Sequence, residues 1–301
     1  MSERITIQQV PEEELVITPG AACQGCGAAL ACRLVFKALG PNTIRHRVPG
    51  CPENETRLPL TGAEFAGGGD ALTGTSRALK MLGREDVNVV GFFGDGGTYD
   101  IGLQAISGAA ERNENVFVVC KDNEAYMNTG NQRSGSTPLY ATTMTTPIGP
   151  LGRGKETPKK NILMIFAAHH VPYAASASIA FYTDLIAKVN YAKKIKGFKM
   201  LIIHSPCPTG WEYDPSKTIE VARLAVQTGI WPLYEIFNGE KLKMNYKPKE
   251  LRPVSEYIKT QGRFRHFTDA MAAEIQGRAT SNWEKLLKLD AGGELTIPFT
   301  P

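Results

Sequence analysis

The run Gly-Asp-Gly-Gly at residues 94–97 constrains this chain more than any other feature, because of the elements predicted around it. Residues 87–93 are an apolar run with the composition of a buried β-strand, and residues 101–111 carry an apolar stripe at helical spacing. Residues 116–120 form a second apolar run, typical of another buried strand. Two consecutive strands joined by a helix run parallel, so their carboxyl ends are expected at one edge of a sheet.

Asp95 and Asn123 lie just past the ends of these two predicted strands, 28 residues apart. A carboxylate and an amide oxygen at one sheet edge suit a hard cation such as Mg²⁺, which keeps some water and takes phosphate oxygens. The glycines let the backbone approach phosphate groups, and the helix amino terminus that follows favours their negative charge. Gly-Asp-Gly alone is also an ordinary turn, but the whole arrangement predicts a site for a divalent metal and a diphosphate.

Four of the six cysteines lie in loops rich in Pro and Gly, where packing gives no reason for a thiol. Cys23 and Cys26 form a C-x-x-C pair, whereas Cys51 lies in Pro-Gly-Cys-Pro and Cys207 in Ser-Pro-Cys-Pro. Four thiolates on such loops fit structural zinc or an iron–sulfur cluster. Structural zinc sites commonly pair two tight knuckles, but two of these cysteines stand alone, and that spacing favours a cluster.

The other two cysteines are interpreted as small apolar residues, since Cys32 falls on a predicted helix and Cys120 within a predicted buried strand. Disulfides are the alternative for any even number of cysteines. However, no secretory signal opens the sequence, and a chain of 301 residues needs no covalent staples. We therefore expect free or ligating thiols and a cytoplasmic location.

With both motifs in view, the chain resembles the thiamine diphosphate-binding beta subunits of the 2-oxoacid:ferredoxin oxidoreductases, and most of all those of the pyruvate:ferredoxin oxidoreductases. The resemblance extends from about residue 15 to Phe264. Its motifs are Cys-Gln-Gly-Cys-Gly-Ala at 23–28, Gly-Asp-Gly-Gly-Thr-Tyr-Asp-Ile-Gly at 94–102, Asp-Asn-Glu-Ala-Tyr-Met-Asn-Thr-Gly at 122–130 and Cys-Pro-Thr-Gly-Trp at 207–211.

The resemblance implies two cofactors, a 4Fe–4S cluster and thiamine diphosphate with Mg²⁺. The cluster would take its four thiolates from Cys23, Cys26, Cys51 and Cys207. The thiamine diphosphate would have its diphosphate lined by Gly94, Gly96, Gly97 and Thr98.

The resemblance also assigns metal-binding and catalytic roles at the second of these motifs. Asp95 and Asn123 would bind Mg²⁺ through their side chains, and the backbone carbonyl of Ala125 would be a third protein ligand. Asn128 would lie beside the reactive carbon of the thiamine as the catalytic hydrogen-bond donor. Such a donor stabilises charge that develops on the bound oxoacid.

The predicted fold class is α/β, with a mainly parallel central sheet flanked by helices. We expect a thiamine diphosphate-binding domain at residues 15–230 and a C-terminal extension at 231–301 that packs on the domain or on partner subunits. Apolar runs at 161–168 and 198–204 are expected to be strands, and residues 182–196 a helix. Cys207 lies three residues past the second of these runs, which would bring it to the same sheet edge as the metal site.

Residues 130–161 have no regular period and are rich in Gly, Thr and Pro, so a long loop is expected. Its first part, residues 129–138, directly follows the cofactor motif and is interpreted as a segment that covers the cofactor or contacts a partner. Residues 153–160 are basic, which indicates either a solvated face or a contact with an acidic partner such as ferredoxin.

The resemblance implies oxidative decarboxylation of a 2-oxoacid, with electrons passed through the cluster to ferredoxin. Pyruvate is the first expectation, with coenzyme A accepting the acyl group. Residues 52–57 and 67–70 are more polar than the apolar and aromatic stretch usual in the family. Oxalate, oxidised to CO₂ without coenzyme A, is therefore an alternative substrate, although contact with a partner subunit explains the same charges. A non-redox thiamine diphosphate lyase is a third alternative, but it has no use for the loop cysteines.

Part of the expected machinery is absent from this sequence. Thiamine enzymes need a glutamate against the aminopyrimidine ring, and Glu64 has no such context. The resemblance implies that an alpha subunit supplies it, beside a gamma or ferredoxin-like delta subunit. No catalytic role is assigned to His169, His170 or His204. We expect no nucleic-acid binding, because no motif supports it, and no membrane span, because no apolar run reaches about 18 residues.

Overall fold

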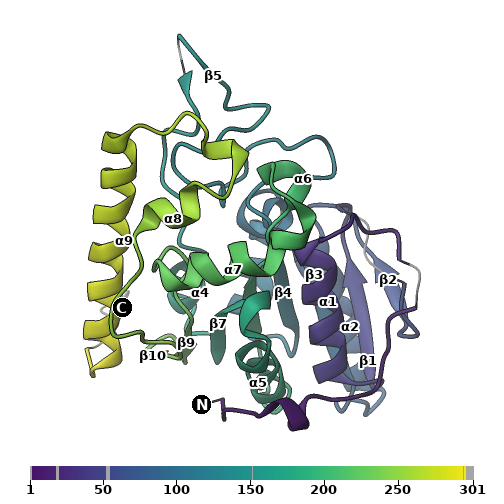
Figure 1. Ribbon diagram of the computed structural model, residues 1–301. Coiled ribbons are helices and arrows are strands. Elements are labelled where there is room, and N and C mark those ends of the chain that lie inside the picture. Colours follow the sequence, from purple (N-terminus) through teal and green to yellow (C-terminus); the bar gives the residue numbers. More distant parts are fainter. Residues whose placement is uncertain (1, 18–19, 52–54, 151, 294, 296–301) are drawn as a thin grey trace.

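Eight strands form the central sheet, in the order β10-β9-β7-β8-β4-β3-β1-β2 (Figure 1). The structure, a computed structural model, describes residues 2–17, 20–51, 55–150, 152–293 and 295. The strands of this sheet are β1 (Thr43–Arg47), β2 (Leu60–Gly62), β3 (Asn88–Gly94), β4 (Phe117–Asp122), β7 (Tyr173–Ser178), β8 (Lys199–His204), β9 (Tyr234–Phe237) and β10 (Lys241–Met244). A separate small hairpin consists of β5 (Ile148–Gly149) and β6 (Gly152–Arg153).

The strands that position the site are parallel. β3 pairs with β4, β4 with β8 and β8 with β7, all in parallel, whereas β9 and β10 add to the edge in antiparallel fashion. The register places Gly94 opposite Lys121, and Asp122 opposite His204. The carboxyl ends of β3, β4 and β8 therefore lie at one edge of the sheet, as predicted.

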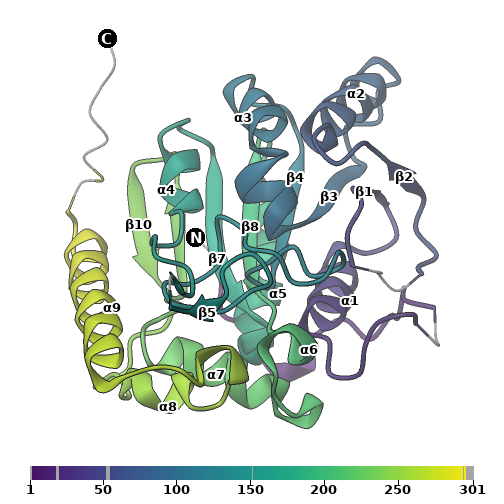
Figure 2. The ribbon, with the colours of Figure 1, turned by 90° about the horizontal axis from the view of Figure 1, so that it is seen from above.

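Helices cover both faces of the sheet (Figure 2): α2, α3 and α4 lie on one side, and α1 and α5 on the other. The alternation of β4 fits this, since Val118 and Cys120 pack with the first set and Phe117 and Val119 with the second. The helices are α1 (Gly27–Leu39), α2 (Gly68–Met81), α3 (Leu103–Glu111), α4 (Ile162–Ala167), α5 (Tyr182–Ala192), α6 (Pro208–Trp211), α7 (Thr218–Gln227), α8 (Val254–Ile258) and α9 (Asp269–Asp290). Short helical turns are a π-helix at Gly96–Asp100 and 3₁₀ turns at Ile7–Gln9, Ile179–Phe181, Pro215–Lys217 and Gly262–Phe264.

The elements predicted around the metal motif are confirmed. The runs at 87–93, 116–120 and 198–204 correspond to β3, β4 and β8, and the helical pattern after residue 101 corresponds to α3. Cys32 lies on α1 and Cys120 on β4, and both are fully buried, as expected of small apolar residues. The helix predicted from residue 182 ends at Ala192, earlier than expected.

The strand predicted at 161–168 is wrong, because this segment forms α4. The Asn161 side chain accepts a hydrogen bond from the Met164 amide at 3.4 Å and caps the helix. The buried residues are Ile162, Leu163, Phe166 and Ala167, which is a helical spacing. A short, continuously apolar sequence is compatible with both a buried helix and a buried strand. Packing against neighbouring elements therefore decides which of the two it forms.

The segment after residue 230 adds to the same sheet. β9 and β10 extend it beyond β7, and α9 packs beside β10 at the outer edge (Figure 2). The long loop expected at 130–161 contains only the hairpin β5–β6 as regular structure in its described part. Residues 52–54, the first part of the polar segment 52–57, lie outside the described residues.

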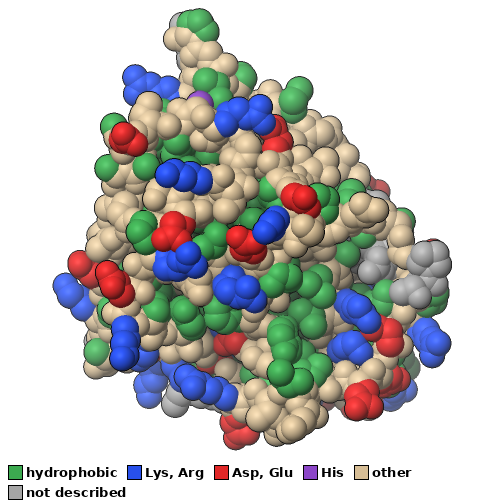
Figure 3. Space-filling model, viewed as in Figure 1, with side chains coloured by type: hydrophobic (Ala, Val, Ile, Leu, Met, Phe, Trp, Pro, Cys, Tyr) green, Lys and Arg blue, Asp and Glu red, His purple; other side chains and the backbone are tan. Residues whose placement is uncertain are grey.

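Figure 3 shows the face of the molecule that is seen in Figure 1. Basic and acidic side chains are interspersed on it, so this face carries no broad field of one sign. Within the described ranges, no helix combines the length and the apolar character that crossing a bilayer requires.

Candidate cofactor and cluster site

Asp95 stands where β3 ends and the chain turns into the π-helix that leads to α3. Its side chain is fully buried. The Ser134 hydroxyl donates a hydrogen bond to Asp95 Oδ2 at 2.5 Å, and Ser134 Oγ in turn accepts from the Ser136 amide at 3.1 Å. Burial, followed by the charge of Asp122, raises the pKa of the Asp95 carboxyl well above its usual value, against the lowering effect of Ser134.

Asn123 follows β4 directly, and its amide faces Asp95. One terminal atom of this amide lies 3.0 Å from Asp95 Oδ1 and 2.8 Å from the carbonyl oxygen of Ala125. With its nitrogen in that place, the amide donates to both oxygens. With its oxygen there, three oxygen atoms from three residues face one another. The parallel strands thus bring together Asp95 and Asn123, which the sequence pattern predicted as metal ligands, and Ala125, which the resemblance added.

A cavity adjoins this group of oxygens at the carboxyl edge of the sheet. Gly94 borders it, and a Cβ built at this position has no atom within 4 Å, so the backbone there is open to a ligand. At Gly96 a Cβ would lie 2.4 Å from the Tyr126 ring, which packs directly on the glycine. The cavity is lined by residues 28, 48–51, 65, 92, 94–97, 121, 123 and 125–129.

Two predicted cofactor residues differ in their position relative to this cavity. Asn128 lines it and is exposed at its rim. Thr98 is fully buried outside the lining, and its hydroxyl donates to the Gly94 carbonyl at 2.9 Å. The Thr98 side chain therefore supports the turn, and only its backbone is left for a ligand.

The four loop cysteines gather beside the same cavity. Cys51 is part of its lining. The pKa of the Cys51 thiol is raised to about 11, mainly by burial and then by the Cys207, Cys26 and Cys23 thiols in that order, whereas Lys121 acts to lower it. Burial also raises the pKa of Cys207, to which Cys26 and Cys23 contribute again. The thiols are thus close enough to influence one another's charge.

Backbone contacts hold two of the cysteine loops together. The Gly27 amide donates to the Pro206 carbonyl at 3.1 Å, and a Cβ at Gly27 would lie 2.6 Å from that oxygen. Cys26 caps α1 and Cys207 caps α6, because each sulfur accepts a backbone N–H at 3.4 Å, from Ala29 and from Gly210. In the described residues, no three His, Cys, Asp or Glu side chains are arranged closely enough to hold a metal ion.

Ser134 and Trp211, which hold Asp95 and Asn123 in place, were not predicted as site residues from the sequence. Ser134 lies in the segment 129–138, which was predicted only to cover the cofactor or to contact a partner. Trp211 stands in the motif at 207–211, and its indole N–H donates to the Asn123 carbonyl at 2.9 Å. Through this bond α6, which begins after Cys207, is tied to the loop that carries Asn123. No local sequence signal identifies either contact, since both join segments far apart in the chain.

Asp122, one residue before Asn123, is the centre of a buried polar network. It accepts hydrogen bonds from the Tyr99 hydroxyl at 2.8 Å, from Ser136 Oγ at 2.6 Å and from Lys159 Nζ at 2.9 Å. Burial lowers the pKa of Lys159, but Asp122 and then Glu124 raise it, with a net increase. This network is connected to Asp95 through hydrogen bonds, because Ser136 contacts both Asp122 and Ser134, and Ser134 donates to Asp95.

The other candidate residues lie apart from the cavity. Glu64 is exposed and does not line it. His204 is fully buried among the rings of Trp211, Trp231 and Tyr257. His169 bonds to Ser107 and to the Ile165 carbonyl, away from the cysteines.

A glycine–aspartate turn at the carboxyl edge of a parallel sheet, with an Asn after the next strand, is the architecture of a thiamine diphosphate enzyme. Residues 66–203 match the family model "Thiamine pyrophosphate enzyme, C-terminal TPP binding domain". The 2-oxoglutarate:ferredoxin oxidoreductase from Magnetococcus marinus, solved with 2-oxoglutarate, coenzyme A and succinyl-CoA, has a similar fold, with a TM-score of 0.56 and 22% identity over 72% of this chain and 81% of that chain.

The sequences of curated relatives define the family more narrowly. Pyruvate synthase subunit PorB of Methanothermobacter thermautotrophicus is 48% identical over 92% of this chain and 99% of its own length. Ketoisovalerate oxidoreductase subunit VorB of Pyrococcus horikoshii is 42% identical over 96% of each chain. The chain belongs to the thiamine diphosphate-binding beta subunits of the 2-oxoacid:ferredoxin oxidoreductases, which work as multi-subunit complexes.

Proposed function

We propose that this chain is the beta subunit of a pyruvate:ferredoxin oxidoreductase that binds thiamine diphosphate, Mg²⁺ and a 4Fe–4S cluster. In the proposed reaction pyruvate and coenzyme A give acetyl-CoA and CO₂, and two electrons leave through the cluster to ferredoxin. The observation that carries the proposal is a single cavity that is lined by the Gly94–Gly97 turn, by Asn128 and by Cys51. A cluster thiolate and the cofactor turn would then adjoin one another.

The oxygen atoms at the sheet edge fit Mg²⁺. Octahedral Mg²⁺ binds oxygen at 2.0–2.1 Å, so neighbouring ligand oxygens are about 2.9 Å apart. The atoms of Asp95, Asn123 and Ala125 stand 3.0 and 2.8 Å apart when the amide oxygen of Asn123 faces inward. A cation there would favour the ionised form of Asp95, whose proton burial otherwise retains.

The surroundings of the cavity fit a diphosphate and a thiazolium ring. The open space at Gly94 lets phosphate oxygens approach the backbone. Phe65 and Tyr126, whose rings meet edge to face 5.9 Å apart, provide an apolar wall. Thiamine diphosphate, when bound, supplies a carbanion that adds to a keto carbon and accepts the electron pair released with CO₂. Asn128 at the rim would donate a hydrogen bond to the oxoacid, and Ser134 would keep Asp95 oriented toward Mg²⁺.

Two features of the thiols support the cluster. Cys26 and Cys207 already accept backbone N–H groups, and such hydrogen bonds stabilise the charge on cluster sulfurs. The mutual effect of the four thiols on the pKa of Cys51 supports their convergence on one group. Ligation would require the cysteine loops to move closer together, since the described side chains do not form a closed metal site.

The relatives are named for two different oxoacids, so they provide two candidate substrates. The PorB relative is a pyruvate synthase subunit, and its 48% identity supports pyruvate for this chain. The VorB relative is a ketoisovalerate oxidoreductase subunit at 42% identity, so a branched 2-oxoacid is the second candidate. Oxalate is kept as a third substrate to be tested, because Lys121, a buried cation, lines the cavity.

The activity would require further subunits. Glu64 is exposed outside the cavity, so we infer that the glutamate for the aminopyrimidine comes from an alpha subunit. A gamma or ferredoxin-like delta subunit would carry electrons onward to ferredoxin. The chain by itself is expected to be inactive.

The proposal can be tested with the complex purified without oxygen. Bleaching of the cluster absorbance is measured after pyruvate, 3-methyl-2-oxobutanoate or oxalate is added, with and without coenzyme A. Fast bleaching by pyruvate, with a second phase that depends on coenzyme A, is the expected result. Bleaching by oxalate that does not depend on coenzyme A would assign oxalate as the substrate in place of pyruvate. The highest kcat/KM with the branched acid would assign that acid instead.

The metal and thiamine diphosphate site can be tested separately from the cluster with one variant and its control. Asp95→Asn is expected to lose bound Mg²⁺ and thiamine diphosphate while it retains iron and sulfide. Ser176→Ala serves as the matched control, because Ser176 is buried and bonds only backbone groups, away from the cavity. Absence of iron and sulfide from the unaltered chain in the complex would reject the cluster assignment and keep the thiamine diphosphate site.

A further inference from the structure

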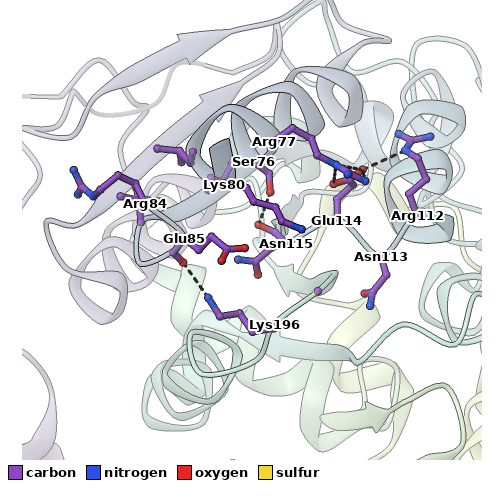
Figure 4. A pocket seen from close by; sticks show the side chains of 14 residues that line it. Ser76, Arg77, Lys80, Arg84, Glu85, Arg112, Asn113, Glu114, Asn115 and Lys196 are labelled. Atoms are coloured by element: carbon purple, nitrogen blue, oxygen red, sulfur yellow. Dashed lines mark hydrogen bonds and ion pairs between the residues drawn. The ribbon is translucent and has the colours of Figure 1, made fainter. Parts of the chain in front are cut away.

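A second and larger cavity, of about 440 Å³, lies at the opposite edge of the sheet (Figure 4). It is bounded by the carboxyl end of α2, by the α3–β4 connection and by the turn before β8. This edge holds the amino ends of the parallel strands β3, β4 and β8, whereas the proposed cofactor site lies at their carboxyl ends. The family's chemistry therefore assigns nothing to this cavity.

Cationic side chains dominate the lining. Five residues are basic and two are acidic: Arg77, Lys80, Arg84, Arg112 and Lys196, against Glu85 and Glu114. Glu114 is buried and already satisfied, since it accepts from Arg77 Nε at 2.8 Å and from Arg112 Nε at 3.4 Å. Figure 4 shows Lys80 reaching into the space from α2.

The lysines of the cavity form no ion pair in the described part of the chain, although the Glu85 carboxylate also lines the cavity. Lys80 makes no ion pair there, and Lys196 Nζ donates only to the Glu85 backbone carbonyl at 3.1 Å. Both ammonium groups are exposed, so each can turn toward a ligand. Arg77 donates to Glu114 through Nε and Nη2, so its Nη1 would be the third donor around this space. Several cationic donors around one space are the arrangement that binds phosphate groups.

A buried lysine next to the cavity supplies an independent observation. A smaller adjoining cavity shares Glu85, Asn115 and Lys196 with the first and is also lined by Lys199. Lys199 is only 6% exposed, and its Nζ reaches only neutral oxygens, Asn115 Oδ1 at 2.8 Å and the Ile195 carbonyl at 3.2 Å. A buried ammonium without a carboxylate is costly, and an anion bound beside it would reduce that cost.

We propose that this cavity binds a small phosphorylated metabolite without a nucleobase, such as a sugar phosphate, through Lys80, Lys196 and Arg77. Its volume lies within the usual range of ligand pockets. Ser76, Asn113, Asn115 and Glu85 offer partners for hydroxyl groups. No aromatic side chain lines the cavity, so nothing there stacks a base.

The helix termini offer a competing explanation for the same charges. α2 and α3 end at this edge, and the negative ends of their dipoles are stabilised by nearby lysines and arginines. That role needs no ligand. The two explanations differ in whether the unaltered protein binds an anion with saturation, and in whether the cavity lysines matter more than another lysine near by.

The test is calorimetric titration of the full chain, in its purified complex and at low salt, with inorganic phosphate, pyrophosphate, fructose 1,6-bisphosphate and ATP. The variants are Lys80→Gln, Lys196→Gln and both together. Lys194→Gln is the matched control, because Lys194 is exposed just beyond the same end of α5 but does not line the cavity. All three lysines are exposed, so the substitutions should leave folding intact, which thermal unfolding checks.

Saturable binding of the sugar bisphosphate, weakened at least tenfold by each cavity variant and unchanged by Lys194→Gln, would support the proposal. The proposal fails if no phosphate compound binds with saturation, or if Lys194→Gln weakens binding as much as the cavity variants. Tighter binding of ATP than of the sugar bisphosphate would overturn the proposed ligand class.

Discussion

Ser134 illustrates how one hydroxyl group can orient a proposed metal ligand. It contributes no charge, yet it fixes Asp95 by donating to Oδ2, which leaves Oδ1 facing Asn123. Its own orientation is set by the Ser136 amide. A carboxylate held in this way presents one oxygen to a cation without further ordering, so part of the entropy of binding is already lost in the folded chain.

We predict that Ser134→Ala weakens Mg²⁺ binding by about tenfold or more, because a hydrogen bond to a charged group contributes about 1.5–3 kcal/mol. The measurement is the Mg²⁺ concentration at which the complex retains half of its thiamine diphosphate. Ser176→Ala removes a buried hydroxyl elsewhere and should leave this concentration unchanged. Equal effects of the two variants would mean that Ser134 acts only on folding.

At the cysteines, a matched substitution separates ligation from structure. Cys207 caps α6 through its sulfur, and serine caps helices at least as well. Cys207→Ser is therefore expected to keep the free energy of unfolding of the cluster-free chain, while this chain loses the iron of its proposed cluster. Iron and sulfide analysis measures the loss. Cys32→Ser should retain iron, since Cys32 is buried within α1, and retention of a full cluster by Cys207→Ser would contradict the assignment.

At the scale of the element, the junction between β3 and the π-helix brings Asp95 to the cavity. Gly94 is the last residue of the strand, and Gly96 begins the turn under the Tyr126 ring. The two glycines face different surroundings, because the space beside Gly94 is empty and that beside Gly96 is filled by protein. They are therefore needed for different reasons, one for the ligand and one for packing.

Alanine substitutions should separate these reasons. Gly94→Ala places a methyl group in the open space, so we expect weaker thiamine diphosphate binding with an unchanged melting temperature of the cofactor-free protein. Gly96→Ala displaces the Tyr126 ring, so the free energy of unfolding should fall by about 1–3 kcal/mol, the usual cost of overpacking. Cofactor titration and urea unfolding measure the two effects. A drop in stability for Gly94→Ala would show that its surroundings are closed.

Other elements show what local sequence leaves undecided. β7 consists of Tyr-Ala-Ala-Ser-Ala-Ser, small residues with weak strand preference, and it was not predicted. It is a strand because it pairs with β8 on one side and with β9 on the other, and all its residues are buried there. The prediction for 161–168 was wrong in the opposite sense. The apolar composition of this segment suited a strand, but Asn161 caps a helix.

At the scale of the whole molecule, the two edges of the sheet differ in chemistry. The carboxyl edge gathers oxygen atoms and thiols, and the amino edge gathers cations around Lys80, Lys196 and Lys199. The net charge of +4 gives no hint of this separation. It arises because α2 and α3 run back along one face of the sheet and end at its amino edge, where the negative ends of their dipoles favour cations.

The buried Lys199 makes global stability depend on pH. Burial, and then Lys196, lower its pKa from 10.5 to about 7. Between these values the unfolded chain binds a proton that the folded chain lacks, so the free energy of unfolding should rise with pH, by at most about 1.4 kcal/mol per pH unit from this group. Urea unfolding at several pH values measures the slope. Lys199→Met should remove this contribution and Lys194→Met should not; identical slopes in the two variants would contradict the prediction.

The parts of the site that are local in the chain could be predicted from the sequence alone. Strand, glycine turn and helix follow one another between residues 87 and 111, and their periodicity and glycines were sufficient to place Asp95 and Asn123 at one sheet edge. The loop cysteines were recognisable because Pro and Gly leave a thiol no packing role.

The distant groups that complete that site are visible only in the folded chain. Ser134 and Trp211 reach Asp95 and Asn123 from segments that no local pattern connects to them. The same is true of β7 and of the cations at the amino edge. Their positions follow from burial and from the parallel order of the strands, and these are properties of the assembled sheet rather than of any short stretch of sequence.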